Sequence, residues 1–239
     1  MAVKTECKNT GFRSLPYRSG NIYNMVTKCL YDQSKKFMTI AKLIGRGSIS
    51  VMDLPCGTGY LARFLDYDIT YTGYDLNHRF LKKILSDWRK GRINLRKMVL
   101  RQIDIFDFDK YPKEKQDVII LCDIIHHVYD KGSNKHLELV ENAKKHAKKV
   151  IICEPVAVKP DQINAKNFLG RWTMRVTKHF PDKIIKYLDF FLADNDGINS
   201  YDKRSDWQHD PTSLMNFYNK LGFNKIYNLD DDYIGIWEQ

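Results

Sequence analysis

Short apolar runs alternate with amphipathic stretches through the middle of the chain, and this alternation predicts the fold. Five runs read as buried strands, spaced roughly 20–30 residues apart, at residues 49–52, 69–74, 98–103, 118–122 and 150–153. The fourth run is continuously apolar, which is typical of a central strand covered on both faces. Because crossovers between parallel strands are right-handed, the carboxyl ends of all five strands are expected at one edge of the sheet.

The two ends of the chain complete this architecture. Residues 21–44 show an amphipathic helical pattern that Gly45 and Gly47 terminate. Near the other end, Asp210-Pro211 begins a predicted helix that stops at Gly222, and two further β-runs follow at 225–229 and 233–237. We therefore expect an α/β fold: a doubly wound, mostly parallel sheet of seven strands with a C-terminal β-hairpin and an N-terminal helix.

The segment between the fifth and sixth strands is longer than a crossover helix needs, which is about 10–15 residues. It is rich in apolar and aromatic residues, so we predict two helices, broken at Pro181, that form a cap over the sheet edge. A larger core without substrate contact is an alternative, and so is a membrane-surface patch, because Lys and Arg interleave the aromatics. The acidic stretch 194–199 is not a calcium loop, since Leu192 and Lys203 would occupy two ligand positions.

These boundaries predict four segments. Residues 1–48 form a basic arm and the N-terminal helix, 49–155 form the cofactor half of the sheet, 156–209 form the cap insertion, and 210–239 add the closing helix and hairpin to the same domain.

A glycine turn follows the first strand, in the stretch Asp53-Leu54-Pro55-Cys56-Gly57-Thr58-Gly59. Glycine lets the backbone approach a ligand closely, and a helical pattern after the turn would direct N–H groups towards that ligand. The stretch is not the dinucleotide fingerprint, because its three glycine positions read Pro55, Gly57 and Tyr60. The sequence thus predicts a nucleotide-type cofactor site that needs no pyrophosphate cradle.

Acidic residues end all five predicted strands. Five acids along one edge of the sheet are more specific evidence for a binding site than the glycine turn or any other single motif. Asp75 can accept hydrogen bonds from both hydroxyls of a ribose, although Asp75 or Asn77 could simply cap the following helix. Asp104 could bind the base of a nucleotide, or it could be an ordinary polar residue of a loop. The acids are Asp53, Asp75, Asp104, Asp123 and Glu154.

Residues 49–155 resemble, motif by motif, the cofactor half of the class I S-adenosylmethionine-dependent methyltransferases. The closing helix that ends in Leu221-Gly222-Phe223, followed by a hairpin, is similar to the small-molecule enzymes of that family. The resemblance implies S-adenosylmethionine as cofactor, S-adenosylhomocysteine as product and adenine binding by Asp104 with the next backbone N–H. The cofactor-binding residues that it implies are Asp53, Pro55, Cys56, Gly57, Gly59, Asp75, Leu76, Asp104, Ile105 and Asp123.

Two histidines follow the fourth strand, where the resemblance places the reactive methyl group. His127, and next His126, could act as the base for a hydroxyl or amine nucleophile, or could instead only shape the pocket. The stretch Asp123-Ile124-Ile125-His126 lacks the Asn/Asp-Pro-Pro-Tyr/Phe motif of amino-directed nucleic-acid enzymes, and no Pro-Cys pair stands there. The expected acceptor is therefore an O, N or S nucleophile of a small molecule or lipid.

Charge and cysteine content bear on partners and compartment. The net charge is +10, with basic clusters in residues 1–50 and between Arg79 and Arg101. Such clusters can bind nucleic acid or anionic lipid, but we favour solvated helix faces. An RNA methyltransferase is thus a second hypothesis, and a non-catalytic cofactor-binding protein a third. Five cysteines without a C-x-x-C pair argue against disulfides and zinc. Without a secretory signal or membrane-spanning run, we expect a cytoplasmic protein.

Overall fold

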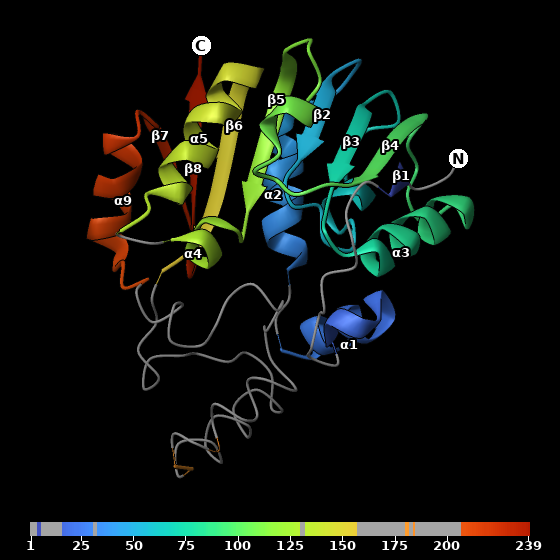
Figure 1. Ribbon diagram of the computed structural model, residues 1–239, viewed down its shortest axis with the longest axis horizontal. Coiled ribbons are helices and arrows are strands. Elements are labelled where there is room, and N and C mark those ends of the chain that lie inside the picture. Colours follow the sequence, from blue (N-terminus) through green and yellow to red (C-terminus); the bar gives the residue numbers. More distant parts are fainter. Residues whose placement is uncertain are drawn as a thin grey trace.

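The computed structural model describes residues 4–5, 16–30, 33–129, 132–156, 180–181, 184 and 207–239. Their strands form one sheet in the order β1-β4-β3-β2-β5-β6-β8-β7 (Figure 1). All strands run parallel except β8, which is antiparallel to both of its neighbours. The strands are β1 (Lys4–Thr5), β2 (Ser50–Asp53), β3 (Thr70–Tyr74), β4 (Lys97–Gln102), β5 (Gln116–Cys122), β6 (Ala147–Pro155), β7 (Lys225–Leu229) and β8 (Asp232–Glu238).

This sheet confirms the predicted doubly wound fold with its C-terminal hairpin. The seven predicted strands are all present, and the two-residue β1 extends the sheet beside β4. Short strands of this kind escape a sequence pattern because two residues show no periodicity.

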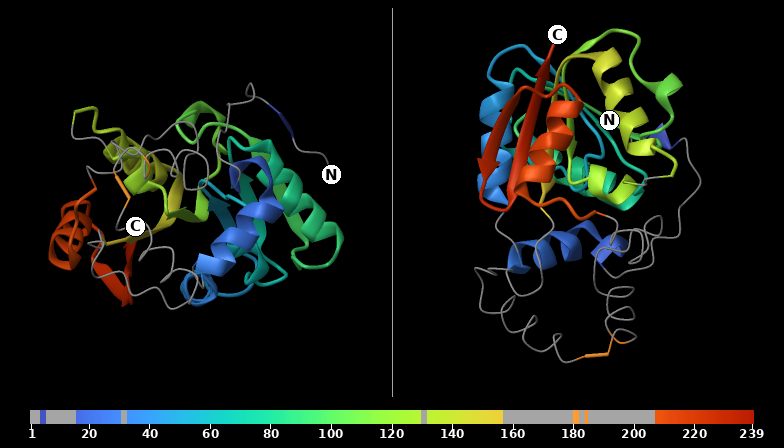
Figure 2. Two further views of the ribbon diagram at one scale, coloured as in Figure 1. Left: turned by 90° about the horizontal axis from the view of Figure 1, so that it is seen from below. Right: turned by 90° about the vertical axis from the view of Figure 1, so that its left-hand side faces the viewer.

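Helices cover both faces of the sheet (Figures 1 and 2). On one face, Ile120 of β5 packs in the same buried cluster as Ile40. On the other face, Ile119 and Leu121 share a cluster with Leu139. This alternation explains the continuous apolar run of β5, which is buried from both sides. The helices of the two layers are α2 (Ser34–Ile44) and α3 (His78–Arg89), then α4 (Ile125–Val128), α5 (Lys135–His146) and α9 (Pro211–Lys220).

The predicted N-terminal helix consists of two pieces, α1 (Gly20–Leu30) and α2. Helix α2 packs on the sheet through Ile40 and Ile44. Helix α1 lies beyond the edge at which the parallel strands end (Figures 1 and 2), next to α3. A single straight helix could not contact both places. The first half of the amphipathic stretch therefore packs near α3, and the second half packs on the sheet.

The expected helix after the glycine turn is reduced to one 3₁₀ turn, η2 (Leu61–Arg63). Only ten residues separate Gly59 from Thr70, where β3 starts, which is too short for an α-helix with its connections. The apolar spacing was informative about burial, because the side chains of Leu61, Ala62 and Leu65 all enter the core. It was wrong about the type of helix, and no helix dipole supports a ligand at this turn.

The closing elements follow the prediction. Asp210 caps α9 by accepting a hydrogen bond from the Ser213 backbone N–H at 2.8 Å, and Tyr218 packs against Gly235 of β8. The predicted cap helices and the stretch 194–199 lie outside the described residues. Within the described part of the chain, no helix has the length and apolar character needed to cross a membrane. Cys56, Cys122 and Cys153 are buried free thiols.

Candidate functional site

The glycine turn is fastened to the end of the neighbouring strand β3. The Cys56 N–H donates to the Tyr74 carbonyl at 2.9 Å, and the Gly57 N–H donates to Asp75 Oδ2 at 2.9 Å. Gly57 and Gly59 both have positive φ angles, of 50° and 70°, which glycine adopts without strain. A carboxylate from one strand therefore fixes the backbone of the turn that follows another.

Asp75 is buried, with 7% exposure, and its second oxygen accepts a hydrogen bond from the Asn77 N–H at 2.7 Å. The cap of α3 is the side chain of Asn77, which accepts from the Arg79 N–H at 3.1 Å. Asn77, and not Asp75, is therefore the capping residue of α3. Asp75 thus joins the glycine turn after β2 to the start of α3.

Asp53 at the end of β2 is 4% exposed and accepts a hydrogen bond from the Tyr71 hydroxyl at 2.7 Å. Burial raises the pKa of Asp53 to about 7; the Tyr71 hydrogen bond opposes this rise and the charge of Asp75 adds to it. Asp53 is therefore poised to gain negative charge when a cation approaches. Burial, followed by the charges of Asp75 and Asp53, also raises the pKa of the Cys56 thiol, so this cysteine stays protonated.

Close packing holds the rest of the turn. A Cβ added to Gly73 of β3 would lie 2.9 Å from the Cys56 sulfur, so only glycine leaves room for that side chain. Pro55, which follows a cis peptide bond, is half-buried. The Thr58 hydroxyl donates to Asn24 Oδ1 at 2.6 Å, which ties α1 to the turn.

The end of β4 brings Asp104 and Ile105 to the same edge. Asp104 Oδ1 accepts from the Phe106 N–H at 3.0 Å, so this carboxylate is engaged in its own loop. The Ile105 carbonyl accepts from the Tyr111 hydroxyl at 2.5 Å. The Leu76 carbonyl accepts from Gln102 at 3.0 Å, which joins the loops after β3 and β4. Their assignment to a cofactor stays a prediction.

Asp123, after β5, forms an ion triad with the buried Lys36 of α2 and with Asp232 of β8; both carboxylates are partly exposed. The Lys36 ammonium lies 2.9 Å from Asp123 and 3.0 Å from Asp232. Burial alone would raise the pKa of Asp123, but Lys36 lowers it below its usual value. Burial raises the pKa of Asp232 to about 6, while Lys36 lowers and Asp123 raises it. The triad keeps Asp123 ionised at the sheet edge.

Glu154 is fully buried at the end of β6 and organises the two histidines. It accepts hydrogen bonds from the backbone N–H groups of Ile124 and Ile125 at 2.9 and 2.7 Å, and its other oxygen lies 2.6 Å from His126 Nδ1. The His126 and His127 rings lie 4.3 Å apart. A carboxylate on Nδ1 orients the imidazole and leaves Nε2 as the nitrogen that can exchange a proton with a substrate.

The structure therefore gathers the five predicted acids and both histidines along one edge of the sheet. A family model described as "Methyltransferase domain" matches residues 46–217. The chain belongs to this methyltransferase family. It is an enzyme of the transferase class, and the edge just described is its candidate active site. Comparison with curated proteins finds no match.

Solved structures share the fold of this methyltransferase. The DhpI-SAM-HEP complex has a TM-score of 0.55 and 16% identity, covering 92% of each chain. Magnesium protoporphyrin IX methyltransferase (ChlM) from Synechocystis PCC 6803, with bound SAH, has a TM-score of 0.51 and 14% identity, covering 89% of this chain and 85% of that one.

A third structure is an O-methyltransferase family protein from Burkholderia thailandensis, with a TM-score of 0.56 and 15% identity over 92% of this chain. The methyltransferase spans only 59% of that protein's length. At such identities the likeness concerns the fold.

Sequence reasoning missed Lys36 and gave Glu154 no role beyond its place in the row of acids. Lys36 did leave a signal, because it stands four and eight residues before the buried Ile40 and Ile44, on the apolar face of α2. A lysine on such a face must find an acidic partner. The partner Asp232 was not predictable, because only the folded sheet brings β8 beside β6 and α2.

Proposed function

We propose that the methyltransferase transfers the methyl group of S-adenosylmethionine to an O, N or S nucleophile of a small molecule or lipid. One observation carries the proposal: the buried Asp75 fixes the Gly57 backbone by accepting its N–H at the edge where the strands end. A Cβ added to Gly57 would meet no atom within 4 Å, so the turn faces open space there. A nucleoside can lie along that backbone with its ribose on Asp75.

The described residues offer polar groups of the kinds that this cofactor would need. Asp75 would accept hydrogen bonds from the ribose, and Asp104 with the Ile105 N–H would hold the adenine. The ionised Asp123 supplies negative charge for a cationic ligand, and a bound cation would lower the raised pKa of Asp53 so that this carboxyl also ionises. When bound, S-adenosylmethionine supplies a methyl group already activated on a sulfonium. The chain chiefly has to position the nucleophile, which contributes up to about 7–11 kcal/mol.

Of the two candidate bases, we propose that His126 accepts the proton of the nucleophile at Nε2. Glu154 Oε2 fixes its Nδ1 at 2.6 Å and stabilises the imidazolium that forms. The sequence favoured His127 over His126 as the base, and this proposal reverses that order. The sequence pattern did not reveal that Glu154 would contact His126.

We further propose that the insertion at 156–209 covers the acceptor. Its two ends meet beside His126: the Trp207 indole N–H donates to the Pro155 carbonyl at 2.9 Å, and the Trp207 ring lies 6.2 Å from the His126 ring. Chain that leaves and returns at this point is placed to surround a bound nucleophile and exclude water.

Replacing His126 by asparagine should lower kcat by about 100-fold or more near neutral pH, because general-base catalysis contributes roughly that much. The matched change His127→Asn should alter kcat by less than about tenfold, since we assign His127 no proton transfer. Initial rates across pH at saturating cofactor measure both. Similar losses in the two variants, or full activity of His126→Asn at every pH, would remove the proposed role of His126.

Alanine at Gly59 should chiefly lower stability, whereas alanine at Gly57 should chiefly weaken cofactor binding. At Gly59 the new Cβ would lie 2.7 Å from Ile84 Cγ1 at a φ of 70°, so the free energy of unfolding should fall by about 2–4 kcal/mol. At Gly57 it should fall by only about 1–2 kcal/mol, the strain of a positive φ. Gly57→Ala should nevertheless weaken cofactor binding about tenfold, because its methyl group enters the proposed ligand space. Urea denaturation and calorimetric titration measure the two quantities; unchanged affinity in Gly57→Ala would contradict the proposed site.

The proposed reaction is tested by calorimetric titration with S-adenosylmethionine and S-adenosylhomocysteine, followed by methyl transfer from labelled cofactor. We expect both ligands to bind, and label to enter small-molecule or lipid fractions of an extract. Label in tRNA or rRNA, with salt-sensitive binding, would favour an RNA methyltransferase instead. Binding of neither ligand would refute the cofactor assignment.

A further inference from the structure

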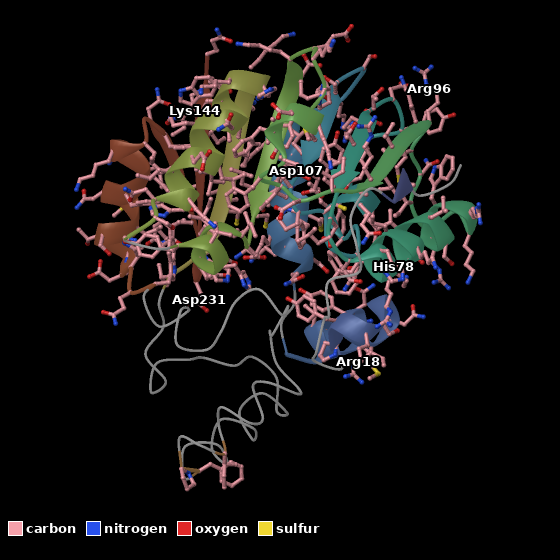
Figure 3. The ribbon with its side chains drawn as sticks, viewed as in Figure 1. Arg18, His78, Arg96, Asp107, Lys144 and Asp231 are labelled. Atoms are coloured by element: carbon pink, nitrogen blue, oxygen red, sulfur yellow. The ribbon has the colours of Figure 1, made fainter. Side chains whose placement is uncertain are left out.

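A basic groove runs between the start of α1 and the outer side of α3. Its volume is about 400 Å³. Figure 3 labels Arg18 and His78, which lie on the two sides of this groove. Six Lys or Arg side chains line it against one acid, Asp87: Arg18, Arg79, Lys82, Lys83, Lys90 and Arg92. We call it the α1–α3 groove.

The single acid does not neutralise the groove. Asp87 is 1% exposed and already pairs with Lys83, with Arg63 at 3.0 Å and with Arg92 at 3.3 Å. Arg79, Lys82 and Lys90 are exposed, and no ion pair within the described residues involves them or Arg18. Like charges this close repel one another, so the groove favours an anionic occupant.

An apolar surface adjoins this positive charge. Ile22 and Met25 of α1 are 38% and 61% exposed. Met25 lies three residues from Ile22 and from the exposed Lys28, and four residues from Asn21, which lines the groove, so Met25 is next to all three on the helix surface. The opposite face of α1 is fixed to the protein, where the Tyr23 ring lies 4.9 Å from that of Phe80. Exposed aliphatic side chains beside a cationic groove are typical of a helix that lies in a membrane interface.

We propose that α1 and the α1–α3 groove dock the enzyme on an anionic phospholipid surface. Headgroup phosphates would enter the groove, and Ile22 and Met25 would insert among the acyl chains. Single-stranded RNA fits less well, because surfaces that bind it offer aromatic faces for base stacking. The nearby rings of Tyr17 and Tyr23 are instead packed on Phe80.

Docking here would place the candidate active site at the membrane. Helix α1 contacts the glycine turn through Asn24 and Thr58, and Asn77 links the groove side to Asp75. The proposal does not depend on the acceptor or on methyl transfer, because binding to vesicles is measured without either.

Co-sedimentation of the full chain with vesicles tests the proposal. Binding is expected to vesicles that contain about 30% phosphatidylglycerol in phosphatidylcholine, and not to phosphatidylcholine alone. It should weaken strongly between about 50 and 300 mM salt. The double variant Arg79→Ala/Lys82→Ala should bind about 30-fold more weakly, and Met25→Gln about tenfold more weakly. The control Arg96→Ala/Lys97→Ala removes the same charge from exposed positions at the far end of the sheet (Figure 3) and should bind within about twofold of wild type.

Three results would overturn the proposal. One is the absence of wild-type binding to the anionic vesicles. Another is an equal loss in Arg79→Ala/Lys82→Ala and in the control, which would reflect net charge alone. The third is displacement from vesicles by glycerol phosphate at matched ionic strength, which would make the groove a site for a free phosphate ester. Salt-sensitive binding to single-stranded RNA that Arg79→Ala/Lys82→Ala abolishes, without vesicle binding, would identify a nucleic-acid surface instead.

Discussion

Replacing Asp75 by alanine is expected to weaken S-adenosylmethionine binding by about 100-fold or more, because two charge-assisted hydrogen bonds to the ribose are lost. The same change leaves the N–H groups of Gly57 and Asn77 without their acceptor. The free energy of unfolding should therefore fall by about 2–4 kcal/mol, which most domains survive. Calorimetric titration and urea denaturation measure the two effects on the same preparation.

Asp117 provides a matched control at the opposite edge of the sheet. Its carboxylate also spans two strands, accepting from the Ser50 N–H at 2.9 Å and from the Ser50 hydroxyl at 2.8 Å. Asp117→Ala should lower the free energy of unfolding by about 1–3 kcal/mol and leave cofactor affinity within about twofold. If Asp75→Ala and Asp117→Ala lost affinity equally, lost stability would explain the result. If Asp75→Ala kept full affinity, the ribose would not lie at Asp75.

Lys36→Met is expected to lower the free energy of unfolding at pH 7.5 by about 3–5 kcal/mol, because it leaves Asp123 and Asp232 without their buried cation. The loss should be smaller at pH 5. Asp232, with its pKa raised to about 6, is already protonated there, so only Asp123 loses a charged partner. Cofactor affinity should also fall, since Asp123 then stands at the site without a fixed partner. Urea denaturation at the two pH values measures the change.

The neighbouring lysine supplies the comparison. Lys35 pairs with Asp230 at 2.8 Å, but both side chains are at least half exposed. Lys35→Met should therefore change the free energy of unfolding by less than about 0.5 kcal/mol at either pH. A small effect of Lys36→Met that matched that of Lys35→Met would show that the ion triad contributes little to stability.

The wild-type triad also has a defined pH dependence. The lowered pKa of Asp123 contributes stability above the usual aspartate pKa of about 3.9, and this contribution is lost as the pH falls through the folded value. The raised pKa of Asp232 acts with the opposite sign, because its contribution is present in acid and is lost as the pH rises through about 6. The net contribution of the two carboxylates to stability is therefore largest between about pH 4 and pH 6.

The sequence predicted the parts of the fold that burial alone determines. Strands β2 to β6 appear as apolar runs because both faces of the sheet are covered. Asp210 predicts the start of α9 because a capping residue bonds to backbone groups only a few residues away. The type of helix after Gly59 was not predictable from spacing, since η2 and an α-helix bury the same side chains over one turn. Its length depended instead on the short connection to β3.

The candidate site was predictable as a row of acids, but the task of each acid was not. Asp53, Asp75, Asp123 and Glu154 look alike at strand ends, yet their partners are a phenol, two backbone N–H groups, an ammonium and an imidazole. Apart from the Asn77 N–H, which is two residues from Asp75, these partners lie 18 to 87 residues away along the chain, and a sequence pattern cannot identify them. The pKa of Asp53 near 7 follows from burial, which the identity of the residue does not reveal.

The ion triad has a consequence for protein synthesis. Lys36 is synthesised 196 residues before Asp232. At about 5–20 residues per second, roughly 10–40 s separate their synthesis. Until β8 pairs with β6, the nascent sheet edge lacks one of the two carboxylates that surround the Lys36 ammonium. The Lys36 ammonium therefore gains its second carboxylate partner only after β8 has been synthesised.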